Sequence, residues 1–384
     1  MANIKDKYSL YNTGLPCAEI QIGIETPWQI KDNLKVKSID ITSGVENESS
    51  LCKIVLEKSQ LKYNKITGNL DGNDPESGLV KRGESITVKL GYTSSASRSM
   101  NLTGDVFKGF ISSVQISYGI VCTVVLECMD AKMWMMAGCK TEEKVGTKYS
   151  MVVTSVLAQY TKSQKITATA VKIDNEPNLN KTLYQNNESD YSFLCRLAEE
   201  TGCLFFIYLG QACFFSVGTY KAVTALELSP CTFVKNIKWT TSVLGLSKEV
   251  VVTGIDPLHP SQEVKSKPVT KNISNIGQSS LTVSPNPVKN VDDITSKNIT
   301  DEGVDTSAYA QFVAQANFTK NSIKHIVCEV TISGHPLGSV LPGYGVRVSG
   351  WGSQIDNTYI LTKIRHVYTN KKFTTELTLA TDTG

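Results

Sequence analysis

The residues best able to do chemistry lie in one short segment, "NESDYSFLCRLAEETG", at positions 187–202. Its charged side chains are four carboxylates, Glu188, Asp190, Glu199 and Glu200, and one guanidinium, Arg196. Two carboxylates that flank a substrate can serve as general acid and general base. However, the first two acids fall at the start of a predicted helix and the last two in its final turns. Arg196 also precedes Glu199 by three residues, a spacing that favours an exposed ion pair. We therefore interpret the four acids as a solvated helix face, with no catalytic residue.

The same segment has the signals of a helix with defined ends. Ser189 is a suitable N-cap, and Asp190 falls in the first turn, where the helix dipole favours negative charge. Gly202 is well placed to end the helix. The apolar side of this helix would consist of Tyr191, Phe193, Leu194, Leu197 and Ala198.

Two apolar strands, "CLFFIYLG" and "ACFFSVG", follow this helix around Gly210–Gln211. Their aromatic residues are Phe205, Phe206, Tyr208, Phe214 and Phe215. An exposed platform that stacks on sugars or bases is one interpretation. Because the rings alternate within strands next to a helix, we expect a core role instead.

The cysteines and histidines lack the spacing of a metal site. The ten cysteines are Cys17, Cys52, Cys122, Cys128, Cys139, Cys195, Cys203, Cys213, Cys231 and Cys328. No pair is spaced C-x-x-C, and the four histidines are scattered. We expect reduced thiols packed as small hydrophobic side chains, with no metal and no cofactor. The sequence also lacks a nucleophile elbow, an H-E-x-x-H helix and a phosphate-binding glycine loop.

Composition and charge narrow the classes of function. Apolar residues make up 41% of the 384, enough to build cores, and the net charge of +3 is too small for binding nucleic acid through its phosphates. The N-terminal "MANIKDKYSLYNTG" does not resemble a secretory signal. The longest apolar run, "CLFFIYL", is far shorter than the ~20 residues of a membrane-spanning helix. We expect a soluble chain made in the cytosol, without a membrane segment.

Hydrophobic periodicity divides the chain into three blocks. Alternation of apolar and polar residues predicts strands over most of 1–135 and again over most of 226–384, and the block at 136–225 mixes helices with strands. A phase slip at Lys37–Ser38 predicts a bulge. Two β-rich blocks of similar size suit a duplicated barrel, although the sequence does not prove duplication.

Two further helices and one irregular segment are predicted. Residues 150–161 have helical spacing with Ser150 as N-cap, and 306–318 have the same spacing. The polar stretch at about 260–304 has no clear period, so we predict a functional arm or mobile loop inserted in the third block.

The segment 183–207, "LYQNNESDYSFLCRLAEETGCLFFI", closely resembles a signature of the baseplate-hub family. That family includes phage late control protein D, the hubs of contractile tails and R-type bacteriocins, and the N-terminal part of type VI secretion VgrG spikes. The matching positions are Tyr184, Gln185, Glu188, Ser189, Asp190, Phe193, Leu194, Arg196, Leu197, Glu199, Glu200, Gly202, Phe205 and Phe206. Similar motifs of the first barrel ("GESITVKLGY", "DVFKGFISSVQ", "VVLECMDAKMWM") and of the second ("HPLGSVLPGYGVRVSG", "YILTKIRHVY") occur in the family's order.

The resemblance implies a β-rich α+β fold. Two tube-like β-barrel domains, at 1–135 and 226–384, would flank an α/β domain at 136–225. Three chains would close into a ring whose six barrels match a six-fold tail tube, while the underside seats a three-fold spike. Because the chain stops at Gly384, just after the second barrel, we expect the spike to be a separate polypeptide.

The same resemblance implies the partners and the place of assembly. The partners would be further copies in a homotrimer, the spike protein, the tail tube or tube-initiator protein, and the tape measure and baseplate wedge proteins. The chain would be made in the bacterial cytoplasm and incorporated into a virion tail baseplate or an injection particle. Two other classes stay open, a tail-associated cell-wall hydrolase and a carbohydrate- or receptor-binding tail module. The kind of parent particle also stays open.

Overall fold

The computed structural model describes residues 2–3, 16–23, 28–29, 35–45, 50–58, 82–93, 100–117, 122–179, 182–217, 224–231, 233–242, 249–256, 259–267, 297–300, 304–323, 326–334, 340–369 and 372–381. Several predicted features lie outside these residues. They include parts of the two predicted β-rich blocks and the middle of the polar stretch, 268–296.

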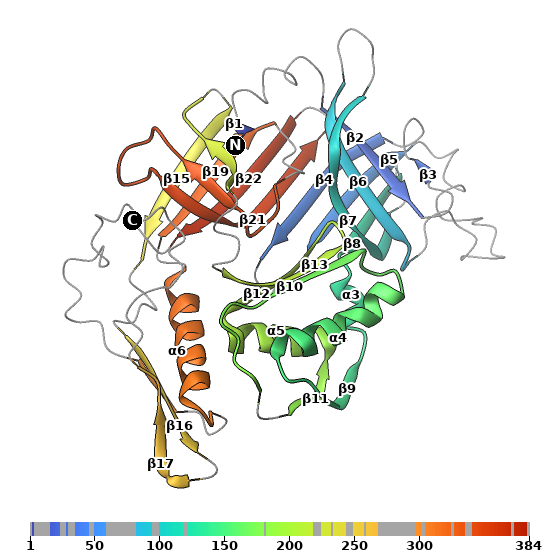
Figure 1. Ribbon diagram of the computed structural model, residues 1–384. Coiled ribbons are helices and arrows are strands. Elements are labelled where there is room, and N and C mark those ends of the chain that lie inside the picture. The colour runs from blue at the N-terminus through green and yellow to red at the C-terminus, as the bar shows by residue number, and fades with distance from the viewer. Residues whose placement is uncertain are drawn as a thin grey trace, which may run out of the picture.

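One large sheet forms the upper layer of the molecule in Figure 1. Among the described residues it has fourteen strands: β1 (Ala2–Asn3), β2 (Pro16–Ile22), β3 (Trp28–Gln29), β4 (Lys35–Gly44), β5 (Leu51–Lys58), β6 (Ser85–Thr93), β7 (Met100–Ser117), β8 (Cys122–Met129), β14 (Thr224–Leu228), β15 (Val234–Thr241), β19 (Ile326–Ser333), β20 (Gly345–Val348), β21 (Asn357–Thr369) and β22 (Lys372–Thr381). The fold is therefore β-rich α+β, as the sequence predicted.

The large sheet contains the same six-strand arrangement twice. In the first half the neighbours run β4-β5-β8-β7-β6-β2, and in the second half they run β15-β19-β22-β21-β20-β14. Each set follows the same order along the chain. The two sets differ at their last pair, which is antiparallel for β2 and β6 and parallel for β14 and β20. The repetition that the sequence left open is thus present in the strand order.

Irregularities recur at equivalent places in the two halves. Lys37 is skipped where β4 pairs with β5, and Lys235 is skipped where β15 pairs with β19. This confirms the bulge predicted at Lys37–Ser38. Ser112 and Thr362 are skipped where β7 and β21 pair with their neighbours β8 and β22. Since a bulge needs a defined local backbone, two matched bulges support a true structural repeat.

The matched bulges also share hydrogen bonds. The Ser112 hydroxyl donates to the Glu127 carbonyl at 2.7 Å, and the Thr362 hydroxyl donates to the Thr378 carbonyl at 3.0 Å. Just before β6 and β20, the amide nitrogens of Gly83 and Gly343 donate to Ile111 and Leu361, each at 2.7 Å. Both glycines have positive φ, of 82° and 89°. The repeat therefore extends to single backbone contacts.

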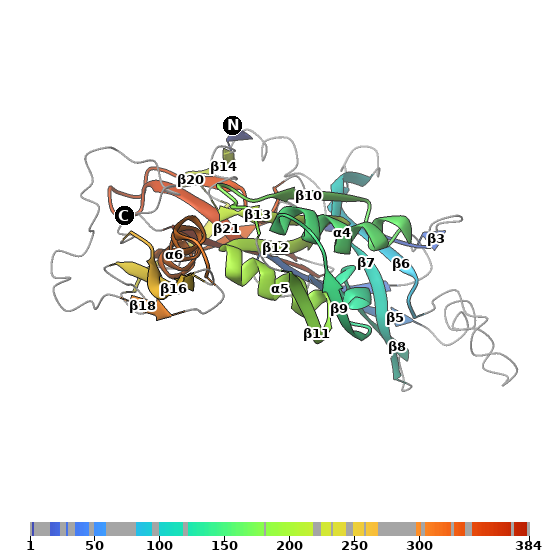
Figure 2. The same cartoon turned by 60° about the horizontal axis from the view of Figure 1, so that its bottom comes forward.

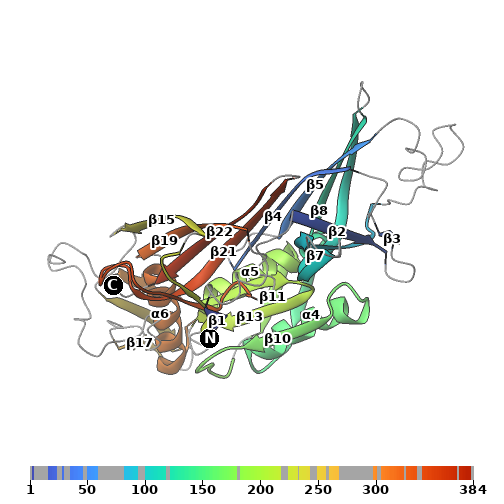
Figure 3. The same cartoon turned by 90° about the horizontal axis from the view of Figure 1, so that it is seen from above.

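Strand β21 joins the two halves. Its first residues pair with β20, and its second half, from Lys363 to Thr369, pairs antiparallel with β4. At this junction the Arg365 guanidinium bonds to both carboxylate oxygens of Asp40, at 2.7 and 3.0 Å. The sheet is thereby continuous from β15 to β7, as Figure 3 shows from above. The predicted domain boundaries remain a prediction.

The smaller α/β part lies below the sheet in Figure 1. It contains the helices α3 (Lys132–Met135), α4 (Tyr149–Lys162) and α5 (Asp190–Thr201), a two-stranded sheet of β9 (Cys139–Lys144) and β11 (Leu183–Ser189), and a three-stranded sheet in the order β10 (Ala168–Lys172), β13 (Gln211–Ser216), β12 (Cys203–Tyr208). In Figure 1 the three-stranded sheet lies between the large sheet and helices α4 and α5.

Strands β12 and β13 are buried on both faces. Phe205, Ile207 and Phe214 join the core formed with α4 and α5, whereas Phe206 and Phe215 pack in a second cluster with Val45 of the large sheet. This confirms the predicted core role of the aromatic residues. A strand buried on both faces has apolar residues at successive positions, which explains the sequence "CLFFIYL".

A third part consists of helix α6 and a small sheet. The helix α6 (Ser307–Ser322) packs on β16 (Val250–Asp256), which pairs with β17 (His259–Lys265) and β18 (Lys297–Thr300). Figure 2 shows α6 beside these strands and close to α5. The two described ends of the polar stretch are thus strands and not an irregular arm, because both pair with β16.

Two helix predictions need correction. Helix α4 begins at Tyr149, one residue before the predicted start, and its N-cap is Lys148 without a side-chain bond. Ser150 is not the cap, since its amide and hydroxyl both donate to the Glu176 carboxylate, at 2.7 and 2.8 Å. Helix α6 has Thr306 as its capping residue and runs four residues beyond the predicted end at 318.

Candidate functional site

The helix α5 has the ends that the sequence predicts. The Ser189 hydroxyl accepts a hydrogen bond from the Ser192 amide at 3.1 Å, and Asp190 occupies the first turn. Gly202 ends the helix in the left-handed conformation, with φ of 63°. The apolar residues Phe193, Leu194 and Leu197 are fully buried against the α/β core. A locally capped helix therefore presents the polar signature residues at defined positions.

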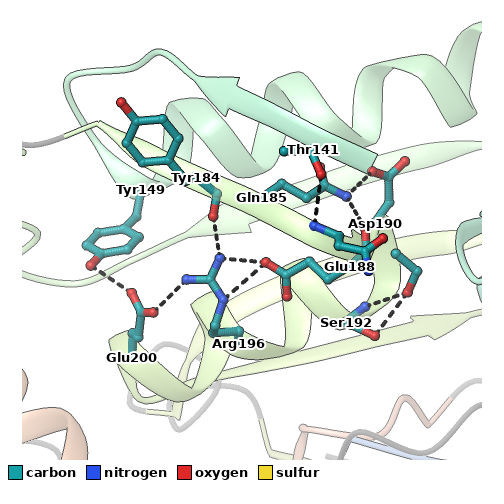
Figure 4. A network of polar contacts seen from close by, with 11 residues as sticks. Thr141, Tyr149, Tyr184, Gln185, Glu188, Asp190, Ser192, Arg196 and Glu200 are labelled. Carbon is teal, nitrogen blue, oxygen red and sulfur yellow. Dashed lines mark hydrogen bonds and ion pairs between the residues drawn. The ribbon is translucent and has the colours of Figure 1, made fainter. Parts of the chain in front are cut away.

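Arg196 is the centre of a polar network that Figure 4 shows. Its guanidinium donates to the Glu188 carboxylate at 2.6 Å, to the Glu200 carboxylate at 3.0 Å and to the Tyr184 carbonyl at 2.7 Å. The predicted pairing of Arg196 with Glu199 is wrong. Glu199 instead contacts Lys320 of α6 at 3.5 Å. Because Glu188 comes from β11, the pairing could not be found from helical spacing alone.

The pKa of Arg196 reflects this setting. Burial alone would lower the pKa of the guanidinium, but the hydrogen bonds and charges of Glu188 and Glu200 outweigh burial and raise it above its ordinary value. Arg196 also lies over the Phe193 ring, 5.2 Å from its centre. The arginine thus ties strand β11 to both ends of helix α5.

Two tyrosines extend the network to the other helices. The Tyr149 hydroxyl of α4 donates to the Glu200 carboxylate at 3.1 Å and shares a hydrogen bond of 2.6 Å with the Tyr309 hydroxyl of α6. Burial is the main cause that raises the pKa of Tyr149 far above its ordinary value, and Tyr309 and Glu200 raise it further. The phenol therefore stays protonated. Helices α4, α5 and α6 are therefore connected by hydrogen bonds through the Tyr149 hydroxyl.

Asp190 is buried, contrary to the prediction that all four acids face solvent. Its side chain is 1% exposed and accepts hydrogen bonds from Lys140 at 2.7 Å, Gln159 at 2.6 Å, Tyr160 at 2.6 Å and Gln185 at 3.0 Å. Burial would raise the pKa of the carboxyl, but the bonds from Lys140, Tyr160 and Gln185 and the lysine charge hold it below its ordinary value. The pKa of Tyr160 is raised by burial and by its bond to Asp190. Asp190 therefore links β9, α4 and β11 as a group that is ionised at neutral pH.

Asp130 is the last residue of the segment "VVLECMD", and no role was predicted for it from the sequence. This residue is 1% exposed and accepts bonds from the amides of Ser50 at 2.7 Å and Lys132 at 2.8 Å. Burial raises the pKa of its carboxyl above the ordinary value, and Lys132 and the two amides offset part of that rise. Since the Ser50 hydroxyl also donates to the Ile207 carbonyl, the cluster connects the large sheet to β12.

The signature residues thus divide between core and network. Phe193, Leu194 and Leu197 pack in the core, and Ser189 and Gly202 end the helix. Glu188, Asp190, Arg196 and Glu200 each bond to another element, whereas the Tyr184 ring is 60% exposed. Every carboxylate of this segment is bonded to a cation or to a hydroxyl group, an arrangement suited to holding elements together.

Most of the cysteine thiols are buried. Of the nine cysteines whose side chains the structure describes, seven are buried, Cys231 is partly buried and Cys139 is exposed. Among the residues that the structure describes, no three His, Cys, Asp or Glu side chains are grouped as metal ligands. Within the same residues, no helix is long and apolar enough to cross a membrane.

Solved structures of phage tail proteins have this fold. A tail protein from Neisseria meningitidis MC58 matches with a TM-score of 0.65 at 15% identity, over 96% of this chain and 97% of that chain. The 43 kDa tail protein of prophage MuSo2 from Shewanella oneidensis matches with a TM-score of 0.64 at 15% identity, over 96% and 98%. An Escherichia coli type VI secretion component, described as similar to the T4 tail proteins gp27 and gp5, matches with a TM-score of 0.55 at 11% identity, over 94% and 76%. The chain has the fold of tail proteins.

A sequence family can also be assigned. The family model for the Alg8 N-terminal domain matches residues 17–370, which is most of the chain. The chain therefore belongs to the Alg8 N-terminal domain family. A comparison with curated proteins gives no match.

Proposed function

We propose that this chain is a structural baseplate hub, of which three copies form a ring between a six-fold tail tube and a three-fold central spike. The observation that carries the proposal is the six-strand unit that occurs twice in one chain with the fold of tail proteins. Three copies would present six similar units around one axis. Such a ring can meet a six-fold partner on one side and a three-fold partner on the other.

The similar proteins support the partners in this proposal. The E. coli protein of similar fold is a component of a type VI secretion system, and a Francisella VgrG complex contains a chain with the same fold at a TM-score of 0.54. By analogy, the partners of this chain would be further copies of itself, a spike protein, and tube or baseplate proteins. The two six-strand units would correspond to the predicted tube-like domains, and the assembled product would be part of a tail or injection particle.

The polar network around Arg196 fits a structural role better than a hydrolytic one. Glu188 and Glu200 bind the same guanidinium, and Asp190 is enclosed by four donors. A general acid needs a raised pKa near its working pH, whereas the pKa of Asp190 is lowered. We therefore assign the network to bracing the α/β part beneath the sheet.

Native mass spectrometry of the purified full chain tests the proposal. We expect a species of three times the 42.0 kDa chain mass, either alone or on addition of the cognate spike protein. A chain that stays at 42.0 kDa with and without spike and tube proteins would contradict the proposal. Peptidoglycan cleavage that is lost in Glu188→Gln would favour the hydrolase instead.

A further inference from the structure

The large sheet has two open ends that lie on opposite sides of the molecule. Eight strands follow one another antiparallel in the order β15-β19-β22-β21-β4-β5-β8-β7. Among the described residues, β15 pairs only with β19, and β7 beyond Ile111 pairs only with β8. Figure 3 shows β15 at one side and the β7–β8 ribbon toward the other. A long exposed edge strand is a pairing template unless something covers it.

The junction inside the chain indicates what covers these edges. There, the edge strand β4 of the first unit pairs with the second half of β21 from the second unit, from Lys363↔Gly44 to Thr369↔Ser38. In the repeat, β15 takes the place of β4 and β7 takes the place of β21. The edges of β15 and of the second half of β7 are thus the two counterparts of this junction, and neither is paired with another strand in the described part of the chain.

The matched bulges fix the register of the equivalence. Since Thr362 matches Ser112, Arg365 matches Gln115 and His366 matches Ile116. Since Lys37 matches Lys235, Ile41 matches Trp239 and Thr42 matches Thr240. The pairs Arg365↔Thr42 and His366↔Ile41 then predict Gln115↔Thr240 and Ile116↔Trp239 between two chains.

Burial distinguishes the closed junction from the open edges. Ile41 and His366, which face each other at the junction, are each 1% exposed. Their counterparts Trp239 and Ile116 pack on the cores of their own halves but are only partly buried. Pairing of the two edges would bring these side chains together on one face and complete their burial.

We propose that β15 of one copy pairs antiparallel with residues 113–117 of β7 in the next copy, in the register Gln115↔Thr240. The proposal rests on the proposed ring and gives it a specific contact. The strand directions agree, since an antiparallel run of eight strands ends with β7 opposite in direction to β15. Because the interface joins two different surfaces, head-to-tail addition closes into a ring only when the rotation per copy fits.

Disulfide trapping tests the register. The full-length double variant Gln115→Cys/Thr240→Cys is prepared with Cys139→Ser, which removes an exposed thiol. Both target side chains are exposed, so the fold should be retained. Directly opposed strand residues lie about 4.5–5.5 Å apart between α-carbons, within disulfide range. A bond within one chain is excluded, since eight strands span roughly 30 Å along the sheet. We expect oxidation to give dimers and trimers on a non-reducing gel, with the 115–240 bond identified by mass spectrometry.

Two matched variants control this result. In Gln115→Cys/Lys238→Cys the second thiol is two residues out of register. In Gln115→Cys/Thr169→Cys the second thiol lies on the exposed strand β10. Both variants should cross-link at least ~10-fold less, because α-carbons more than about 7 Å apart are not bridged. A trimer by native mass without the 115–240 bond would overturn the edge pairing and leave the proposed function standing. Cross-linked chains longer than three would support the pairing and overturn the ring of three. Monomers without any bond would overturn both.

Discussion

Among single residues, Asp190 shows most clearly how distant segments determine a local environment. The sequence places it in the first turn of a helix, and that is where it lies. Its burial could not be predicted, because the covering groups come from distant segments. Lys140 of β9 lies 50 positions away, and Gln159 and Tyr160 of α4 lie 31 and 30 positions away. Only Gln185 is a near neighbour in sequence.

Replacement of this carboxylate by an amide should destabilise the protein. Asp190→Asn removes a buried charge that Lys140 and three neutral donors satisfy, and we expect a loss of about 2–3 kcal/mol at pH 7 in denaturant unfolding. Glu199→Gln is the matched control. Its side chain is 54% exposed and meets an exposed Lys320, so we expect a change below about 0.5 kcal/mol. Equal effects of the two substitutions would contradict the bracing role of Asp190.

The lowered pKa of Asp190 also predicts the pH dependence of that difference. A group whose pKa is lower in the folded state stabilises the fold above its unfolded pKa, near 3.9, and the stabilisation is lost as the pH falls through the folded value. The advantage of the native protein over Asp190→Asn should therefore be constant from pH 5 to 7 and shrink below about pH 4. An advantage that grows toward acid pH would mean that the pKa is raised.

Among the elements, helices α5 and α6 come close to each other at Gly202. A β-carbon at this glycine would lie 2.6 Å from the α-carbon of Ala316 and 3.0 Å from its carbonyl oxygen. Glycine is therefore needed both for the left-handed conformation and for the contact. The sequence predicted the first reason, because a C-cap is local, but the partner Ala316 is more than one hundred residues away.

Gly202→Ala should weaken this contact between helices. We expect a loss of about 2–4 kcal/mol, from the cost of a left-handed alanine together with overpacking against α6. Gly138→Ala is the control, since Gly138 has no positive φ and a β-carbon there would meet nothing within 4 Å. Thermal and denaturant unfolding should show a clearly smaller loss for the control. A loss at Gly202 no larger than at Gly138 would mean that the left-handed conformation and the approach of the two helices together contribute nothing.

Local signals explain why some elements were predictable and others were not. The ends of helix α5, alternation in strands and the bulge at Lys37 follow from neighbouring residues, and these predictions agree with the structure. The partner of Arg196 was predicted wrongly because the carboxylate that it prefers, Glu188, is brought close by strand β11. Ser150 looked like a cap, but Glu176 from a later loop binds it. Each of these predictions was wrong because a tertiary contact with another segment determines the partner of the side chain.

In the whole molecule, the repeat within the sheet is the feature on which the proposed function depends. Its two halves have little visible sequence similarity, and equivalent positions hold pairs such as Ile41 and Trp239. Strand order, bulges and shared backbone bonds reveal the repeat because they depend on pairing across the sheet. That information is absent from local sequence patterns, which is why the sequence suggested duplication without establishing it.

The central claim is that copies of this chain continue one sheet around a ring. A cryo-electron microscopy map of the purified oligomer tests it most directly. The account predicts three copies with six similar units around the axis, and β15 of each copy hydrogen-bonded to β7 of the next. An oligomer in which the edge of β15 faces solvent, or in which the units do not alternate around a common axis, would contradict it.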